Sequence, residues 1–477
     1  MLLLALLALL ALLLAPFVLP PRGHTVTAAA ADDDGSDLQR RGEETLARLR
    51  IKTATGDVFV AGLPRFPRVF ARDLLVAALL RDNATDLRQA LLFCAAHQGT
   101  TRDPVTGEEP GKIVHEFPGV SLPASKGTRT TTEFNSIDAT PLFLIAAFRY
   151  TQLRSDPTTM DALEQPLRAA VEYVLAHVDR RSQLYVEDPS LAGGAKRFAL
   201  AVTYWKDSAV QGRVGGVPVY PVAYTLAHAQ AICALRCASA LLPDRSLVRK
   251  ADRMVDALNE QLWDPLLGSF AVGRDEQGLL TGTSSDALHM LWYLRAGDVS
   301  SDRIEAVVNA SRPLETVAGY AASTQSRQSY HGFTVWPFEQ AFVHAAAIEY
   351  GLGEAASVAL RADAALSMAP SLGEHFQIRG DRGDGEHAQL SETNEMLWTA
   401  AAAIYFASAR SGRVLARPAG AWPIVAHSVH GVNPMDLQDY APGEMFRCLD
   451  GQQRIPYSWL NDDYCDWYGQ RGRRMKI

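Results

Sequence analysis

Two acidic residues that are far apart in the chain, Asp207 and Glu374, could carry out acid–base chemistry. Asp207 lies in "YWKDS" (204–208) and Glu374 lies in "SLGEHF" (371–376), and both stretches fall in long segments without regular hydrophobic periodicity. Hydrolysis of a glycosidic bond uses two such acids, one to protonate the leaving oxygen and one to activate water. The aromatic neighbours of Asp207 lower the local polarity and are expected to raise its pKa, as a proton donor requires. We therefore expect Asp207 to be the acid and Glu374 the base.

Other polar and aromatic residues gather in the same long segments. Aromatic rings stack on the apolar faces of sugar rings, whereas charged groups bind sugar hydroxyls. Plainer interpretations exist, because Asp207 could cap a turn or pair with Lys206, and proline and acidic residues after Trp336 are favoured at helix starts in any case. The residues expected to line a sugar-binding site are Arg72, Asp73, Glu116, Trp205, Lys206, His331, Trp336 and Glu339.

The segments between these clusters follow the periodicity of helices. Apolar residues recur at three- and four-residue steps, and alternating strand patterns are scarce, so the chain is expected to be all-α. The expected helices are 38–50, 70–82, 85–97, 138–153, 159–178, 222–241, 245–263, 284–296, 301–311, 336–352, 354–369 and 391–409.

The connections between the expected helices alternate in length. Short ones are 154–158, 242–244 and 353, and long ones are 98–137, 179–221, 312–335 and 370–390. Structureless loops this long are uncommon in compact domains unless they serve a function. Helix hairpins stacked in a ring would bring all the long connections to one face, which predicts an (α/α)6 barrel. An open helical-repeat solenoid is the alternative, but no fixed-period repeat supports it.

The two ends of the chain differ from this helical region. Residues 1–31 begin with a long Leu- and Ala-rich stretch, which is typical of a signal peptide or an N-terminal membrane anchor. The expected barrel then spans 32–415, and 416–477 form an irregular C-terminal tail expected to pack on it. Export would make the protein secreted, or membrane-anchored and facing the lumen or exterior. It would also make the sequons at Asn83 and Asn309 usable for glycosylation.

Composition limits the remaining possibilities. The net charge of -7 gives no basic surface for nucleic acid, so no nucleic-acid partner is expected. The five cysteines follow no metal-binding pattern, and neither a metal nor a cofactor is expected. Cys233 and Cys237 are interpreted as core thiols because their spacing on one helix seldom allows a disulfide. Cys448 and Cys465 are the more suitable pair for a disulfide.

Five segments resemble, in order, the glucosidase half of glycogen-debranching enzymes and their bacterial amylo-α-1,6-glucosidase relatives. The similarity extends from about residue 66 to 400, and any one segment alone would be a weak match. The segments are "FPRVFARDLL" (66–75), "GKIVHEFPG" (111–119), "SIDATPLFLI" (136–145), "YWKDS" (204–208) and "SYHGFTVWPFEQAF" (329–342).

This resemblance implies a fold, an activity and residue roles. The fold is the six-hairpin barrel of glucoamylases, trehalases and processing glucosidases. The activity is exo-acting hydrolysis with inversion, which removes a terminal α-linked glucose from an oligosaccharide or glycoside. Asp207 matches the acid of the family and Glu374 its base. Positions matching the pocket for the terminal sugar are Arg72, Asp73, Asp138, His331, Trp336 and Glu339, and Trp398 matches an aromatic residue after the last loop.

Two departures from the family pattern keep alternatives open. Ala209-Val210 replaces the usual Gly-Asp after "WKDS", and Glu374 lies between Gly373 and a histidine where the family has proline and a different neighbour. Glu392 and Glu395 are therefore alternative bases. The enzyme could also prefer mannosyl or other glycosyl groups, or the chain could bind carbohydrate without cleaving it. A helical scaffold for protein partners is a further class, which predicts exposed apolar stripes.

Overall fold

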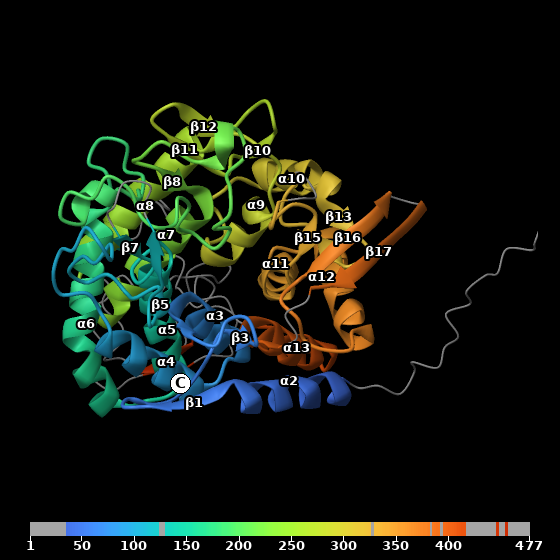
Figure 1. Cartoon of the computed structure of the whole chain (residues 1–477), viewed down its shortest axis with the longest axis horizontal. Coiled ribbons are helices and arrows are strands. Elements are labelled where there is room, and N and C mark those ends of the chain that lie inside the picture. Colours follow the sequence, from blue (N-terminus) through green and yellow to red (C-terminus); the bar gives the residue numbers. More distant parts are fainter. Residues whose placement is uncertain are drawn as a thin grey trace, which may run out of the picture.

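The computed structural model describes residues 35–123, 129–325, 329–381, 384–391 and 395–415, with two short strands at 445–447 and 454–456 (Figure 1). The expected N-terminal leader, both members of the expected disulfide pair and nearly all of the C-terminal tail lie outside the described residues. Among the helices that are described, none is long and apolar enough to cross a membrane. Cys94, Cys233 and Cys237 are buried and free, which confirms the interpretation of the last two as core thiols.

Helices dominate the described residues and follow the expected segments closely. The bounds are α2 (Ser36–Leu49), α3 (Ala71–Arg81), α4 (Ala84–Ala96), α5 (Ala139–Leu153), α6 (Pro157–Ala176), α7 (Thr225–Leu241), α8 (Arg245–Gln261), α9 (Asp286–His289), α10 (Ser301–Ala310), α11 (Pro337–Glu349), α12 (Gly353–Met368) and α13 (Leu397–Arg410). Short 3-10 helices are η1 (Pro189–Leu191), η2 (Val214–Gly216), η3 (Met290–Tyr293) and η4 (Arg312–Leu314).

The helices divide into a central and a peripheral set. Nearly every residue of α5 and α7 is buried. By contrast, α8 buries one stripe, which consists of Leu247, Ala251, Met254, Ala257 and Leu258. A helix that is apolar on all sides belongs in the core, whereas an amphipathic helix covers it. In Figure 1, α3, α5, α7, α9, α11 and α13 accordingly lie toward the centre, with α2, α4, α6, α8, α10 and α12 around them.

Helices that are consecutive in the sequence contact each other in pairs. Each central helix contacts a peripheral helix that adjoins it in the sequence, as α7 contacts α8 and α11 contacts α12. Helix α13 contacts α12 as well, but it packs more extensively against α2, from the other end of the described chain. Among central helices, α3 contacts α5, α5 contacts α7, α7 contacts α9, α9 contacts α11, α11 contacts α13, and α13 contacts α3.

The expectation of an all-α chain is incomplete, because the connections contain short strands. Most of the described strands have two or three residues, which is too few to give an alternating pattern in the sequence, and only two of them, with six and seven residues, are longer than four. The strands are β1 (Arg50–Thr53), β2 (Gly56–Phe59), β3 (Gly62–Leu63), β4 (Val69–Phe70), β5 (Glu116–Phe117), β6 (Ser121–Pro123), β7 (Arg129–Thr131), β8 (Ala223–Tyr224), β9 (Trp263–Asp264), β10 (Ser269–Phe270), β11 (Gly273–Asp275), β12 (Gly278–Leu280), β13 (Glu315–Thr316), β14 (Gly319–Tyr320), β15 (Thr334–Val335), β16 (Phe376–Asp381), β17 (Asp384–Leu390), β18 (Glu395–Met396), β19 (Met445–Arg447) and β20 (Arg454–Pro456).

Four of the described strand pairs join segments that are distant in the sequence; one is β8 with β11, and the other three lie beside the predicted site residues. Strand β15 pairs with β16 and aligns Val335 with Phe376, so the loop before α11 lies beside the segment that contains Glu374. Strand β3 pairs with β18, which brings the loop after residue 63 to the start of α13. Strand β4 pairs with β5 and aligns Phe70 with Glu116. These pairs fix the connections that lead into α3, α11 and α13.

Candidate active site

Arg72, at the first turn of α3, contacts two of the long connections, those that lead into α5 and α7. Its Nε donates to both carboxylate oxygens of Asp138, at 2.8 and 2.9 Å, and its Nη2 donates to the carbonyl oxygen of Thr203 at 3.0 Å. Its Nη1 lies 3.6 Å from Oδ2 of Asp207. Arg72 and Asp138 are buried, so this ion pair is shielded from water. One guanidinium thereby holds the start of α5 and the loop of the predicted acid.

Asp207 is the more accessible of the two predicted catalytic acids. Its side chain is 31% exposed, and it follows three buried residues of the 177–224 connection. Burial raises the pKa of Asp207 to about 6, the charge of Arg72 opposes this rise, and the charge of Asp138 adds to it. A carboxyl group with this pKa can hold a proton close to neutral pH, as a general acid must.

Glu374 lies on the opposite connection, directly before β16. Its backbone N–H donates to Ser391 Oγ at 3.0 Å, and its side chain is 5% exposed. Burial raises the pKa of Glu374 to about 7, whereas a hydrogen bond from Tyr330 and the charge of Arg65 oppose the rise. Its Oε2 atom is buried and has no hydrogen-bond partner among the described residues. Nδ1 of His375 lies 3.8 Å from this oxygen.

The structure brings Asp207 and Glu374 into one electrostatic environment. The charge of Asp207 contributes to the raised pKa of Glu374. The residue after Asp207, Ser208, shares a 2.8 Å hydrogen bond with Nδ1 of His331, and the neighbour of His331, Tyr330, is the residue that donates to Glu374. Two acids with raised pKa values in one buried site are a known sign of a catalytic centre.

Asp73 adds a third carboxyl group to the same environment. It is 5% exposed at the first turn of α3. Burial raises the pKa of Asp73 to about 8; Arg72 opposes the rise, and the charges of Glu374 and Asp207 contribute to it. Asp73 is therefore neutral at neutral pH in the unliganded protein and can donate as well as accept a hydrogen bond.

The predicted aromatic residues form a buried layer. Trp336 is 1% exposed and stacks on the rings of His331 and His375, at centroid distances of 4.9 and 4.8 Å. Trp205 meets Trp336 edge to face, and Trp398 stacks on Phe338 at 4.4 Å. The exposed fractions of Trp205 and Trp398 are 3% and 5%. This burial favours a supporting role for these indoles over the direct sugar stacking expected from the sequence.

Lys206 and Glu339 lie in a polar cluster within the protein. Lys206 is 3% exposed, and its Nζ is 3.7 Å from Oε1 of Glu339. Glu339 accepts a hydrogen bond from Ser285 Oγ at 2.7 Å and lies 3.7 Å from Nδ1 of His289. Both residues therefore contact protein groups, and neither is exposed at the surface of the site.

Two other predicted residues form ion pairs with nearby arginines. Glu116 is buried in β5 and lies 3.4 Å from Arg68. Glu395, one of the alternative bases, forms an ion pair with Arg48 of α2. Glu392 lies outside the described residues. Among the described residues expected as the base, Glu374 is the one whose pKa is raised by the charge of Asp207.

Sequence reasoning missed Asp286, which accepts hydrogen bonds from Tyr204 and Trp205. An aspartate at a helix start gives no functional signal by itself. It also gave no role to Tyr330, although this residue directly precedes His331 in one of the segments that resemble the glucosidases, and none to Arg65. The charge of Arg65 acts on Glu374, which is more than 300 positions away in the sequence, and residue type alone gives no indication of this.

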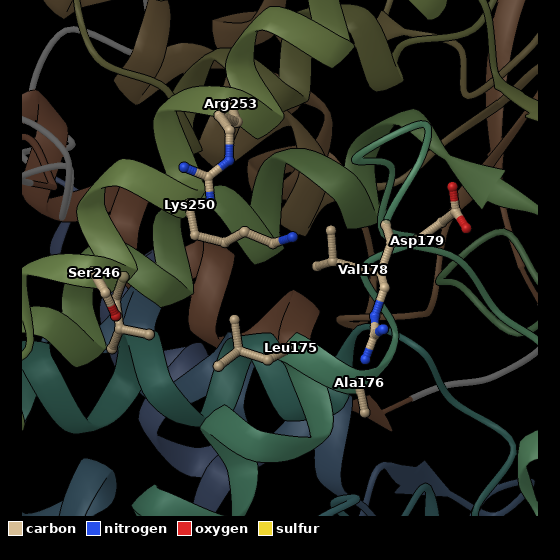
Figure 2. Close-up of a pocket in the computed structure, with 9 residues that line it drawn as sticks. Leu175, Ala176, Val178, Asp179, Ser246, Lys250 and Arg253 are labelled. Carbon is tan, nitrogen blue, oxygen red and sulfur yellow. The ribbon is translucent and has the colours of Figure 1, made fainter.

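A separate surface pocket of about 510 Å³ lies between the C-terminal end of α6 and the N-terminal half of α8. Figure 2 shows Lys250 extending from α8 toward Val178, with Arg253 further along the same helix. The lining includes three basic residues, Arg180, Lys250 and Arg253, but no aromatic ring and none of the predicted site residues. It lacks the pair of acids that glycoside cleavage requires.

Comparison of the described coordinates with solved structures defines the fold. A GH63 mannosylglycerate hydrolase from Thermus thermophilus, solved with Tris and D-glycerate, matches with a TM-score of 0.55 and 15% identity over 77% of this chain and 99% of that chain. A rhamnosidase from Klebsiella oxytoca with bound rhamnose matches with a TM-score of 0.50 and 16% identity over 80% of this chain and 64% of that one. A GH78 rhamnosidase from Bacillus sp. GL1 matches at 0.52 and 13%, over 80% of this chain and 35% of that one.

These matches give the chain the fold of the (α/α)6 glycosidases. No known sequence family matches the chain. No curated protein sequence matches it either. None of the three structures named above is a debranching enzyme, so the substrate implied by the sequence resemblance stays a prediction. At identities of 13–16%, the likeness concerns the fold, and function has to be argued from the site.

Proposed function

We propose that this protein is a glycoside hydrolase whose central helices close into an (α/α)6 barrel around the site. The observation that carries the proposal is the convergence of Asp207 and Glu374, from two different connections, in one site where both have raised pKa values. The glycosidase fold of the solved neighbours supports it independently.

Asp207 protonates the glycosidic oxygen as the bond to the anomeric carbon breaks, and the electron pair of that bond leaves with the alcohol. Glu374 takes a proton from a water molecule, whose oxygen forms the new bond to the anomeric carbon. The raised pKa of Glu374, about 7, suits a group that takes up a proton near neutral pH. The resemblance to inverting glucosidases favours this single displacement over a covalent intermediate.

The order of the two pKa values has a consequence for the mechanism. The productive form has Asp207 protonated and Glu374 ionised, yet Glu374, with a pKa of about 7, holds its proton to higher pH than Asp207, at about 6. A difference of one unit makes the productive form roughly a tenth of the singly protonated population. The two acids titrate as a coupled pair. The pH dependence of the rate therefore reports apparent pKa values of the pair, and neither value is assigned to one residue alone.

For the substrate we propose a terminal α-linked glucose, on the basis of the segments that resemble debranching-type glucosidases. A terminal mannosyl group is the second candidate, because a structural neighbour is a mannosylglycerate hydrolase. We propose that the sugar hydroxyls are bound by Asp73, Arg72 and Asp138, or by residues that these three hold in place. We further propose that the protein is secreted, or anchored through residues 1–31.

A panel of aryl α-glycosides tests the proposal. The wild-type chain is expected to release the aryl group from an α-glucoside or an α-mannoside. Asp207→Asn and Glu374→Gln are expected to reduce turnover by about 10²–10⁴-fold on those members of the panel whose phenol is a poor leaving group. Asp363→Asn, a substitution in a distant ion pair with Arg410, is the matched control and should retain activity. Saccharide binding without turnover by the wild type would instead identify a carbohydrate-binding protein.

A further inference from the structure

A single buried carboxylate holds the residues that precede Asp207. Asp286 is 1% exposed and begins α9. The hydroxyl of Tyr204 donates to its Oδ2 at 3.2 Å, and the indole N–H of Trp205 donates to its Oδ1 at 3.0 Å. The Nζ atom of Lys206 lies 2.9 Å from the same Oδ1. Three consecutive side chains therefore converge on one carboxylate.

The remaining contacts of Lys206 strengthen this attachment. Its ammonium donates to Ser284 Oγ at 2.7 Å, to Ser285 Oγ at 3.0 Å and to the carbonyl oxygen of Ala322 at 2.8 Å. Since an ammonium group has three N–H donors, these contacts and Asp286 occupy it fully. Ser284 Oγ also donates to Oδ2 of Asp286 at 2.9 Å. Lys206 thus fastens its loop to the segment that leads into α9.

The chain leaves this anchor at Asp207. On the other side, the carbonyl oxygen of Thr203 accepts hydrogen bonds from Arg72 at 3.0 Å and from the backbone N–H of Ile137 at 3.1 Å. Asp207 itself has a partly exposed side chain that lies 3.6 Å from Nη1 of Arg72, and the hydroxyl of Ser208 after it shares a 2.8 Å hydrogen bond with Nδ1 of His331. The anchored residues before Asp207 therefore set the position of its carboxyl group together with Arg72 and the Ser208–His331 hydrogen bond.

We propose that Asp286 is a positioning residue for the proton donor, acting through Tyr204, Trp205 and Lys206. The inference rests on the proposed glycoside hydrolase function and on the role of Asp207 as the acid. A general acid has to lie within hydrogen-bond reach of the leaving oxygen, and a displacement of about 1 Å can cost about 10²-fold in rate. Loss of the Asp286 carboxylate removes the shared acceptor of Tyr204 and Trp205 and one contact of Lys206, so the support before Asp207 is weakened.

The leaving group distinguishes this role from a general structural one. A sugar or alkyl leaving group needs the proton from Asp207, because an alkoxide leaves poorly. Fluoride departs without a proton, while Glu374 still has to activate the water. A displaced Asp207 therefore slows cleavage of a disaccharide and leaves hydrolysis of a glycosyl fluoride nearly unchanged.

The test compares Asp286→Asn with wild type in the full chain, on an α-glycosyl fluoride and an α-linked disaccharide of the sugar that wild type accepts. We expect kcat to fall about 10²-fold on the disaccharide and less than about 3-fold on the fluoride. Asp363→Asn, which removes a carboxylate from a buried ion pair in α12, should change neither rate. Equal losses on both substrates, or no loss on the disaccharide, would overturn the positioning role.

A milder variant keeps the test decisive if Asp286→Asn fails to fold. Tyr204→Phe removes one donor to Asp286 but keeps the ring, which stacks on Tyr224 at 4.5 Å. We expect a smaller loss, of about 5-fold, on the disaccharide and none on the fluoride. A uniform loss on the two substrates would contradict the inference while leaving the hydrolase proposal intact. A wild-type chain that cleaves neither substrate would overturn both.

Discussion

The guanidinium of Arg72 lies 3.6 Å from the carboxylate of Asp207 and donates to both oxygens of Asp138. The same residue also binds the backbone just before the acid, at Thr203. The ion pair that orients the start of α5 is thus directly connected to the proposed proton donor. The side chain of Arg72 therefore contributes to the stability of the fold and to the position of the proposed proton donor.

Replacing Arg72 tests the structural side of this connection. Arg72→Met leaves Asp138 buried at 1% exposed without its cation, and the unfolding free energy is expected to fall by about 3–5 kcal/mol. The double variant Arg72→Met/Asp138→Leu should recover part of this loss, because no unpaired charge remains. Chemical denaturation measures both values. A single variant as stable as wild type would show that the pair contributes little.

The pH dependence of kcat/KM should be a narrow bell. With pKa values of about 6 for Asp207 and about 7 for Glu374, the limbs are expected near those values. Below the lower limb both acids are protonated and no base is present, and above the upper limb both are ionised and no proton donor remains. Initial rates from about pH 4 to 9 give the profile. A plateau several units wide would contradict the coupled, raised pKa values.

Substitution of Arg65 is expected to shift only the basic limb of the pH profile of kcat/KM. Its charge lowers the pKa of Glu374, so Arg65→Ala is expected to raise that pKa and shift the basic limb to higher pH. The rate at the optimum should fall, because the form with Glu374 ionised becomes rarer. Arg65→Lys keeps the charge and serves as the control, with a limb close to that of wild type. A basic limb that stays in place in Arg65→Ala would refute the contribution of Arg65.

Asp73 should lower the stability of the protein as pH rises. Burial raises its pKa from 3.8 to about 8 in the folded state, so between about pH 4 and 8 the folded chain holds a proton that the unfolded chain has released. Stability from this group is complete below the unfolded pKa and is lost as pH rises through the folded pKa. Asp73→Asn is therefore expected to have a Tm similar to wild type at pH 5 and higher by a few degrees at pH 8.

Asp363→Asn is the control for Asp73→Asn, and its expected change in Tm at pH 8 is opposite. Asp363 forms an ion pair with Arg410, so Asp363→Asn should lower the Tm at pH 8. Thermal unfolding of the two variants at both pH values makes the comparison. An Asp73→Asn protein less stable than wild type at pH 8 would mean that the ionised carboxylate is stabilised by groups near it.

Most of the helices could be predicted from the sequence because their apolar residues recur at helical steps. The expected helix at 284–296 is the main exception, since α9 covers only Asp286–His289 and a 3-10 turn follows. The last helix begins at 397 instead of 391, because Glu395 and Met396 pair as a strand with β3. Such strand pairs join distant segments, and neither segment shows a periodic pattern of apolar residues that would predict the pair.

The candidate site was only partly predictable for the same reason. Asp207 and Glu374 were identified from sequence motifs, but the burial of Trp205 and Trp336 depends on packing between distant loops. The role of Asp286 depends on three donors from residues 204–206. Residue type at Asp286 gives no indication of those partners. Motifs therefore located the acids, and only the tertiary structure located the groups that hold them.

The central claim is that Asp207 and Glu374 cleave a glycosidic bond by a single displacement. The most direct measurement is NMR of the first sugar released from an α-glycoside by the wild-type chain, with Asp207→Asn and Glu374→Gln as blanks. We predict that the β-anomer appears first and that both variants release little sugar. First appearance of the α-anomer, or undiminished release by either variant, would contradict the account.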